Sequence, residues 1–284
     1  MKKKKQNLLL LFVLSSLFAS AQLTDLARVE YSFIPKHDSK DQYTRLRLLL
    51  NYPTEVKEDA YLVVGAEYNR IHLNLRDDYP FDKNTLETLT IIDFNLAYTY
   101  KMNEKWRVAF KVSPRIASTF NEKITGDDLF LNGGIYFIKD RRRVEEITKP
   151  YRLILGLTYN TTAGIPFPLP IISYFRKLNE KWTYSIGVPK MNIKHLLSEK
   201  QTIQAFASLD GYFAHVQKPT MIQGESIDNI SLSVAVTGVG YEYFLSDHVV
   251  WYTYLGYTAR MSNVLRNADR KSCYYRCSCF DNWT

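Results

Sequence analysis

The stretch from Ile91 to Ile116 constrains the fold most, because its apolar residues recur at every second position. Positions 92, 94, 96, 98 and 100 are apolar or aromatic and alternate with polar or small residues, and positions 106, 108, 110 and 112 repeat the pattern. A period of two is that of a β-strand with one apolar and one polar face, and the polar segment 101–105 predicts a hairpin turn between two such strands. Aromatic residues beside the turn are typical of a membrane β-barrel at a membrane surface.

A second strand with the same alternation is long enough to cross a bilayer. Tyr151, Leu153, Leu155, Leu157 and Tyr159 share one face. The two tyrosines are separated by roughly 26 Å at about 3.3 Å per residue. With a tilt of about 40°, this distance corresponds to roughly 20 Å of height, close to the apolar band of an outer-membrane barrel. The pattern favours a membrane barrel over a soluble β-sandwich, which stays as the alternative.

The N-terminus predicts export. Four lysines at positions 2–5 precede the apolar run Leu8–Leu14, and Ala19-Ser20-Ala21 follows it. This order predicts a signal peptide over residues 1–21, cut before Gln22. The apolar run is shorter than the roughly 20 residues that a membrane helix needs. Cleavage leaves 284 − 21 = 263 residues and lowers the formal charge from +8 to +4, so the basic character of the chain does not call for a nucleic-acid partner.

Strand-like segments follow one another along the chain without a long amphipathic helix between them. We therefore expect an all-β protein, an antiparallel transmembrane β-barrel of about 12 to 14 strands. The turn 100–106 resembles 176–182, and 195–200 and 243–248 are looser relatives. If all four turns lie on the inner side of the membrane, Lys181–Leu196 must be two strands broken near Pro189, which gives fourteen. If that segment is one strand, the count is nearer twelve. A slip of the apolar phase between Val236 and Val239 predicts a bulge around Gly238.

The connections fall into two groups. Longer ones, expected outside the cell, are Pro35–Gln42, Arg76–Glu87, Asn121–Asp128 and Gln217–Asp228. Their acidic residues Asp77, Asp78, Asp82, Asp127 and Asp128 are expected to be solvated, with calcium binding as the alternative. The segment Thr161–Pro170 contains three prolines, which we expect to prevent strand pairing. It either constricts the interior or caps the rim.

The C-terminal residues differ from the rest of the chain. We divide the chain into the signal peptide 1–21, a barrel domain 22–262 and an atypical tail 263–284. The tail shows no period of two and contains all three cysteines, Cys273, Cys277 and Cys279. A frameshifted or truncated end would leave the closing strand missing or altered. The alternative is a metal or disulfide knot.

Charged residues on the polar faces of the strands are the candidate lumen lining. Two hypotheses follow: a cationic lumen that favours anionic solutes, or a lumen held shut by ion pairs of Glu30 with Arg45 or Arg47 and of Asp93 with Arg107. The lumen candidates are Arg28, Glu30, Arg45, Arg47, Asp93, Arg107, Lys111, Arg115 and Arg152. Aromatic residues near strand ends are the candidates for the membrane interface: Tyr98, Tyr100, Trp106, Tyr151, Tyr159, Trp182 and Trp251.

No constellation for catalysis stands out. Some membrane barrels modify lipids with a histidine and a serine near the rim, and only His37-Asp38-Ser39 brings those residue types together here. Three neighbours in one loop do not form a relay by adjacency, and Gly-x-Ser-x-Gly is absent from the sequence. We expect no catalytic residues, no metal site and no cofactor, with a lipid-modifying barrel enzyme as the alternative.

Three segments carry a resemblance to a known family: the run Asp128–Asp140, the turn Lys177–Trp182 and Ile186–Pro189. They resemble an uncharacterised family of outer-membrane β-barrels of Gram-negative bacteria, known only as a domain of unknown function. The resemblance covers most of residues 22–260 and is not expected in the tail. It implies an outer-membrane location, contact with outer-membrane lipid and insertion by the barrel-assembly machinery. The expected role is a passive channel or a structural or surface barrel.

Overall fold

The computed structural model describes residues 25–35, 40–77, 82–142, 149–161, 167–222, 224–268 and 272–273. They form one sheet of fourteen strands with two short 3₁₀ turns, η1 (Lys83–Thr85) and η2 (Gly126–Asp128). No helix among these residues is long and apolar enough to cross a membrane. The strands are β1 (Ala27–Pro35), β2 (Gln42–Lys57), β3 (Ala60–Asn74), β4 (Thr88–Lys101), β5 (Arg107–Ser118), β6 (Leu129–Asp140), β7 (Tyr151–Asn160), β8 (Phe167–Lys177), β9 (Trp182–Val188), β10 (Lys190–Ser198), β11 (Gln201–Ile222), β12 (Glu225–Ser246), β13 (Val249–Arg266) and β14 (Ser272–Cys273).

Each strand pairs with the next, and a single extra contact closes a barrel of seven strands. Ser118 at the end of β5 pairs in parallel with His215 of β11, so β5 to β11 form a closed circuit. Strands β1 to β4 extend the sheet on one side of this contact, and β12 to β14 extend it on the other. The prediction of an all-β barrel is confirmed, but the prediction of a single closed ring of 12 to 14 strands is wrong.

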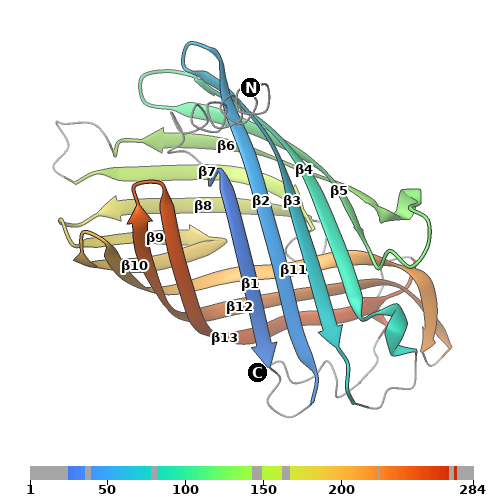
Figure 1. The fold of residues 1–284 in the computed structure, drawn as a ribbon. Helices are drawn as coiled ribbons and strands as arrows, with labels where there is room; N and C mark the ends of the chain where they lie inside the picture. The colour runs from blue at the N-terminus through green and yellow to red at the C-terminus, as the bar shows by residue number, and fades with distance from the viewer. Residues whose placement is uncertain are drawn as a thin grey trace, which may run out of the picture.

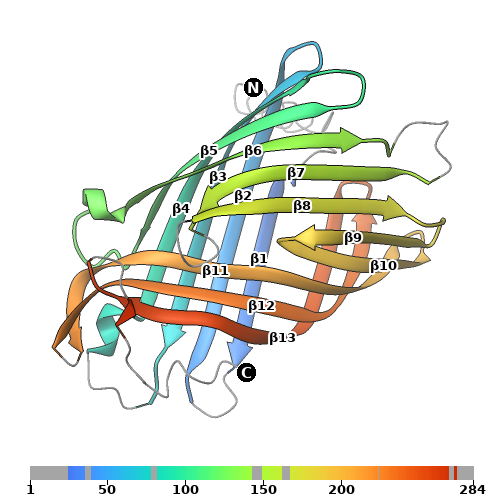
Figure 2. The same cartoon turned by 180° about the vertical axis from the view of Figure 1, so that it is seen from behind.

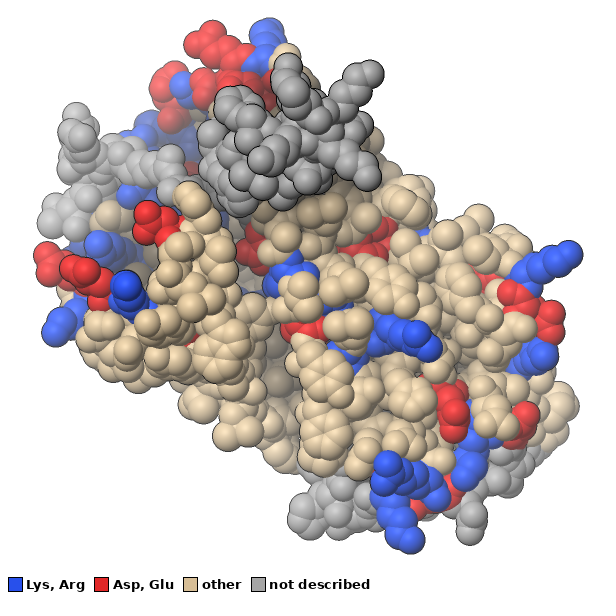
Figure 3. Space-filling model, viewed as in Figure 1, with Lys and Arg blue, Asp and Glu red and all other residues tan. Residues whose placement is uncertain are grey.

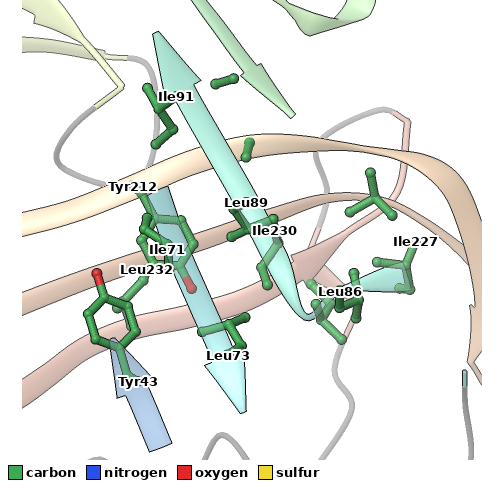
Figure 4. Close-up of a cluster of buried hydrophobic side chains, with 14 of the residues drawn as sticks. Tyr43, Ile71, Leu73, Leu86, Leu89, Ile91, Tyr212, Ile227, Ile230 and Leu232 are labelled. Carbon is green, nitrogen blue, oxygen red and sulfur yellow. The ribbon is translucent and has the colours of Figure 1, made fainter. Parts of the chain in front are cut away.

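The two extensions cross one another and enclose an apolar core. In Figures 1 and 2, β1 to β4 run steeply across the molecule, and β11 to β13 pass across their lower ends in a different direction. Side chains from both groups meet between them (Figure 4), and we call this cluster the apolar layer. Its members include Tyr43, Ile71, Leu73, Leu86, Leu89, Ile91, Tyr212, Ala214, Ile227, Ile230, Leu232 and Leu265.

The apolar layer explains why the sheet does not open into a wide ring. These side chains lie on the inward faces of their strands, at the end where β3 is followed by η1. Ile71, Leu86, Leu89 and Ile230 are completely buried. In a wide, water-filled barrel they would be hydrated, whereas burial stabilises the folded chain by about 25 cal/mol per Å² of apolar surface. The inward faces therefore collapse onto each other, which draws β5 and β11 together.

Four similar short turns lie at one end of the sheet, which we call the turn end; the opposite end is the loop end. The four similar turns follow β4, β8, β10 and β12, all even-numbered, as the fourteen-strand alternative requires. Lys181–Leu196 contains β9 and β10, with the break at a cis Val188–Pro189 bond. The count of fourteen strands is therefore right for the sheet, although the closed circuit contains seven.

The predicted bulge at Gly238 is wrong. The pairing of β12 with β11 is regular from Asn229 to Tyr243, and Gly238 lies in register opposite both Phe206 and Gly256. The apolar residues move from the inward to the outward face of β12 because the strand leaves the apolar layer at this point. Val236 points inward and packs against the apolar layer, whereas Val239 points outward and is 59% exposed.

Two predicted loops are partly strand. β11 extends to Ile222 and β12 begins at Glu225, so most of the expected loop Gln217–Asp228 is paired strand. Pro168 and Pro170 belong to β8 and pair with Tyr159 and Leu157 of β7. They are tolerated because β9 pairs with β8 only from Ile172 onward, so the prolines lie on a stretch of free edge that requires no N–H donor there.

The predicted signal peptide, residues 1–21, lies outside the described residues. In the tail, β13 continues to Arg266, and Ser272–Cys273 pair with Leu265 and Arg266 as β14. Cys277 and Cys279 lie outside the described residues. The division at residue 262 and the frameshift hypothesis stay predictions.

Candidate functional site

Residues of β1 to β7 and of β11 surround a polar cavity of about 240 Å³, which we call the interior cavity. It is adjacent to the apolar layer, because β2, β3 and β4 carry apolar inward residues at the loop end and polar inward residues next to them. On β4, for example, Leu89 and Ile91 are followed inward by Asp93 and Asn95. Six of the nine predicted lumen residues line the cavity: Arg28, Arg45, Arg47, Asp93, Lys111 and Arg115.

One cluster of charges joins β2 to β11 across the interior. Arg45 donates from one nitrogen to both carboxylate oxygens of Asp210, at 3.2 and 3.0 Å, and its Nε donates to Asn69 at 3.1 Å. Arg47 also donates to Asn69, at 2.9 Å, and forms ion pairs with Glu67 at 3.3 Å and Glu30 at 3.6 Å. The predicted pairing of Glu30 with Arg47 is thus present. Asp210 was not among the predicted lumen residues.

A second, more buried pair lies between β4 and β5. Arg115 donates to both oxygens of Asp93, at 2.7 and 2.9 Å, and to the Thr161 hydroxyl at 2.6 Å. Asp93 and Arg115 are directly opposite in the β4–β5 register. Arg107 was predicted as the partner of Asp93, but it lies near the turn, opposite Lys101, and donates to the backbone oxygen of Asp59 at 2.7 Å.

The other predicted charges have different surroundings. Arg28 lies 3.3 Å from Asp25 and 3.8 Å from Glu30. Arg152 is half-buried, opposite Asp140 in the β6–β7 register and toward the turn end. Lys111 lines the interior cavity with an exposed side chain, and no carboxylate of the described residues forms an ion pair with it, although the charges of Asp93 and Glu67 act on it.

A third polar cluster lies between β10, β11, β12 and β13. Lys194 Nζ lies 2.8 Å from both carboxylate oxygens of the nearly buried Glu242, and Gln204 donates to the same carboxylate at 2.7 Å. Tyr254 extends the cluster through its hydroxyl. These residues alternate with outward apolar ones, for example Lys194 with Ile193, and this alternation was the signal that could have identified them.

Asp128 was expected in a solvated loop, but it is completely buried. Its carboxylate contacts His215 Nδ1 at 2.8 Å and accepts from Gln217 Nε2 at 2.9 Å and from the Thr125 N–H at 2.8 Å. Burial alone would raise the pKa of Asp128, but the hydrogen bonds from Thr125, Ser118, His215 and Gln217 outweigh it and hold this pKa below its usual range. The cluster attaches η2 to β11 at the point where β5 and β11 meet.

The predicted interface aromatics gather mostly at the turn end. Tyr98 and Tyr100 contact each other at 6.0 Å between ring centroids, and Trp182 lies 4.3 Å from the ring of His195. Trp251 is exposed beside Tyr241. Trp106 and Tyr151 both lie under the Lys139 ammonium, at 5.9 Å. Tyr159, by contrast, is exposed at the loop end of β7.

Among the described residues, a serine and a histidine do lie close together, but their contacts join structural elements to one another. Ser118 and His215 both bond Asp128, whereas in a serine relay the hydroxyl bonds the histidine. The His37-Asp38-Ser39 triplet lies outside the described residues. Within the described ranges, no three His, Cys, Asp or Glu side chains gather as a metal ion would require.

Comparison with known proteins gives one match. A search of curated proteins found none that matches the chain. A family model matches residues 34–278, which extends beyond residue 260 and into the tail, so the expectation that the resemblance stops before the tail is wrong. The matched range covers far more than half of the 284 residues. The chain therefore belongs to the family described as a domain of unknown function (DUF6268).

Proposed function

We propose that this protein is an outer-membrane β-barrel whose interior is closed at the loop end and accessible from the turn end. Such a barrel would work as a structural or solute-binding protein of the membrane and not as an open pore. The observation that carries the membrane part is the outward face of the sheet, where large apolar side chains are exposed on strand after strand: Val29, Tyr31, Leu48, Leu50, Phe94, Leu96, Phe110, Val112, Leu131, Leu155, Leu157, Ile172, Ile186, Val239 and Leu255.

A soluble protein rarely exposes so much contiguous apolar surface. In lipid the same residues need no further partner, because alternation places them against hydrocarbon while their neighbours point inward. Figure 3 supports this reading for one face of the molecule: broad areas carry no charge, and most charged side chains lie toward the margins of the view, with a few near its centre.

The aromatic residues at the turn end support an orientation. Tyr98, Trp106, Trp182 and Trp251 lie beside three of the short turns, those after β4, β8 and β12, where the rings of a membrane barrel occupy the lipid–water boundary. Short turns are typical of the periplasmic side. The signal peptide expected over residues 1–21 is consistent with export to that compartment.

The apolar layer argues against a continuous water-filled channel. Water and ions pass a barrel where its interior is polar and open. Here the inward faces of β2–β4 and β11–β13 meet in buried side chains at the loop end, such as Leu89, Tyr212 and Leu232. Toward the turn end, the inward positions beside the interior cavity are small, Gly65, Ala97 and Ala109. We infer a cup that opens toward the turn end, past Tyr61 and Arg107, which lie on the inward face nearer the turns.

Two measurements test the proposal. Purified protein in mild detergent should migrate faster on a gel before boiling than after, as folded membrane barrels do, and cell fractionation should recover it with the outer membrane. In planar bilayers it should show no stable conductance steps. Recovery of the mature chain from the periplasm without detergent would contradict the membrane assignment. Stable conductance steps would contradict the closed interior, and hydrolysis of lipid esters would point to an enzyme instead.

A further inference from the structure

The interior cavity contains one cation, Lys111, that forms no ion pair within 4 Å among the described residues. Each arginine that lines the cavity has a carboxylate within 4 Å: Arg45 has Asp210, Arg47 has Glu67, and Arg115 has Asp93. Arg28 likewise has Glu30 at 3.8 Å. Lys111 differs, because no hydrogen bond or ion pair connects its ammonium to any of the described residues, and its side chain is accessible in the cavity. The charges of Asp93 and Glu67 act on Lys111 without contact, and each of these carboxylates is paired with an arginine.

The neutral groups around Lys111 offer donors. Asn95 accepts from the Ser113 hydroxyl at 2.7 Å, and Asn132 accepts from the Thr161 N–H at 3.2 Å. These bonds occupy the carbonyl oxygens of both amides, and the amide N–H groups have no partner among the described residues. A wall that presents free N–H groups beside a cation fits a ligand that carries acceptor oxygens.

Tyr136 adds a hydroxyl at the same place, because two glycines make room for its ring. A side chain at Gly134 would begin 2.7 Å from the Tyr136 hydroxyl, and one at Gly156 would begin 2.7 Å from the edge of the ring. The ring therefore lies flat along the wall over both glycines, and the cavity stays open. Gly134 is directly opposite Lys111 in the β5–β6 register, so the hydroxyl lies beside the lysine.

We propose that the interior cavity binds a small oxyanion, a carboxylate or a phosphate, with Lys111 as its charge partner and Asn95, Asn132 and Tyr136 as neutral donors. The cavity of about 240 Å³ has room for a ligand larger than a single water molecule, such as a small carboxylate or phosphate. This inference rests on the proposed function, because the ligand is taken to enter from the turn end of a membrane barrel. It names the class of solute that the cup would hold.

The test is a calorimetric titration of the full mature chain, folded in detergent, with inorganic phosphate and separately with succinate. Glucose, which is neutral, and chloride serve as controls. We expect saturable binding of at least one oxyanion and none of glucose. Lys111→Gln should weaken that binding about tenfold or more, the effect of losing one charge-assisted hydrogen bond. Lys111→Arg, which keeps the charge, should stay within a few-fold of the wild type.

Lys181→Gln is the matched control, since it removes the same charge from an exposed turn outside the cavity. Absence of saturable oxyanion binding by the wild type would overturn the inference, and so would equal binding by Lys111→Gln and Lys181→Gln. The gel shift on boiling is measured on every variant. A chain that shows the shift but binds no oxyanion contradicts this inference alone, whereas a chain that binds an oxyanion without the shift contradicts the membrane barrel alone.

Discussion

Removing one partner of a buried ion pair in the interior should change the free energy of unfolding more than removing one partner of a surface pair. Arg115 and Asp93 are both less than one-tenth exposed and are joined by two short hydrogen bonds. Removing one partner leaves the other charged and buried, which is costly because a desolvated ion loses its hydration without compensation. An exposed pair gains little, since water screens it.

We predict that Arg115→Ala lowers the free energy of unfolding by about 3–5 kcal/mol, measured by urea denaturation in a fixed detergent. Arg142→Ala provides the control. Arg142 also forms two short bonds to an aspartate, Asp140, but the pair is exposed, so its loss should cost no more than about 1 kcal/mol. Equal losses for the two variants would contradict the account of the interior.

Asp128 makes a prediction about pH. Its pKa in the folded chain lies below the ordinary value of 3.8, so its contribution to stability is fully present above that value and is lost as the pH falls through the folded-state pKa. Asp128→Asn should therefore be less stable than the wild type at pH 6–7. The difference should begin to shrink below about pH 4, where the carboxylate takes up a proton in the unfolded chain, and it should disappear once the pH is below the lower pKa of the folded chain. A difference that stays constant or grows in acid, in unfolding followed at each pH, would contradict the role assigned to this carboxylate.

At the scale of single elements, strands change the face on which they carry apolar residues. On β4, Leu89 is completely buried in the apolar layer, whereas Leu96 is 49% exposed on the outward face. Both are leucines on the same strand, so they separate core packing from lipid contact. The apolar layer should respond to truncation as a soluble protein core does.

We predict that Leu89→Ala costs about 2–5 kcal/mol of unfolding free energy, because it removes buried methyl groups and leaves a cavity. Leu96→Ala should cost a fraction of that, since detergent or lipid adapts to the smaller side chain. Both are measured by denaturant unfolding in the same detergent. Similar losses would mean that position 89 is not part of a packed core.

The same change of face sets the limit of what the sequence predicts. The hairpin at 91–116, the even-numbered turns and the break at Pro189 depend on local patterns and are confirmed. The apolar layer depends on strands distant in the sequence, and its local trace is a change of phase, as between Ile91 and Ile92 on β4. On β12, the corresponding change between Val236 and Val239 predicted a bulge that the structure does not contain.

For the site, the sequence predicted which charges point inward but not all of their partners. The inward charges follow from parity, and six of the nine line the interior cavity. The pairing of Asp93 with Arg115 instead of Arg107 depends on the exact strand register. Asp210 and Glu242 were missed, because their partners Arg45 and Lys194 come from strands that are brought together only by the fold.

At the scale of the whole molecule, the account combines an apolar outside, a polar cup and an apolar seal. All three parts arise from strands whose side chains alternate between two faces. The parts differ in which residues lie on each face at a given height along the strands. The central claim is that the outward positions contact hydrocarbon while their neighbours line an aqueous interior.

The most direct test places a spin label at position 96 or at its neighbour 95, in a chain whose Cys273, Cys277 and Cys279 are replaced by serine. The protein is reconstituted in lipid vesicles, and power saturation measures collisions with oxygen and with a water-soluble nickel chelate. The account predicts that the label at 96 meets oxygen and little nickel, and that the label at 95 shows the reverse preference. Nickel access at 96 equal to that at 95 would contradict it.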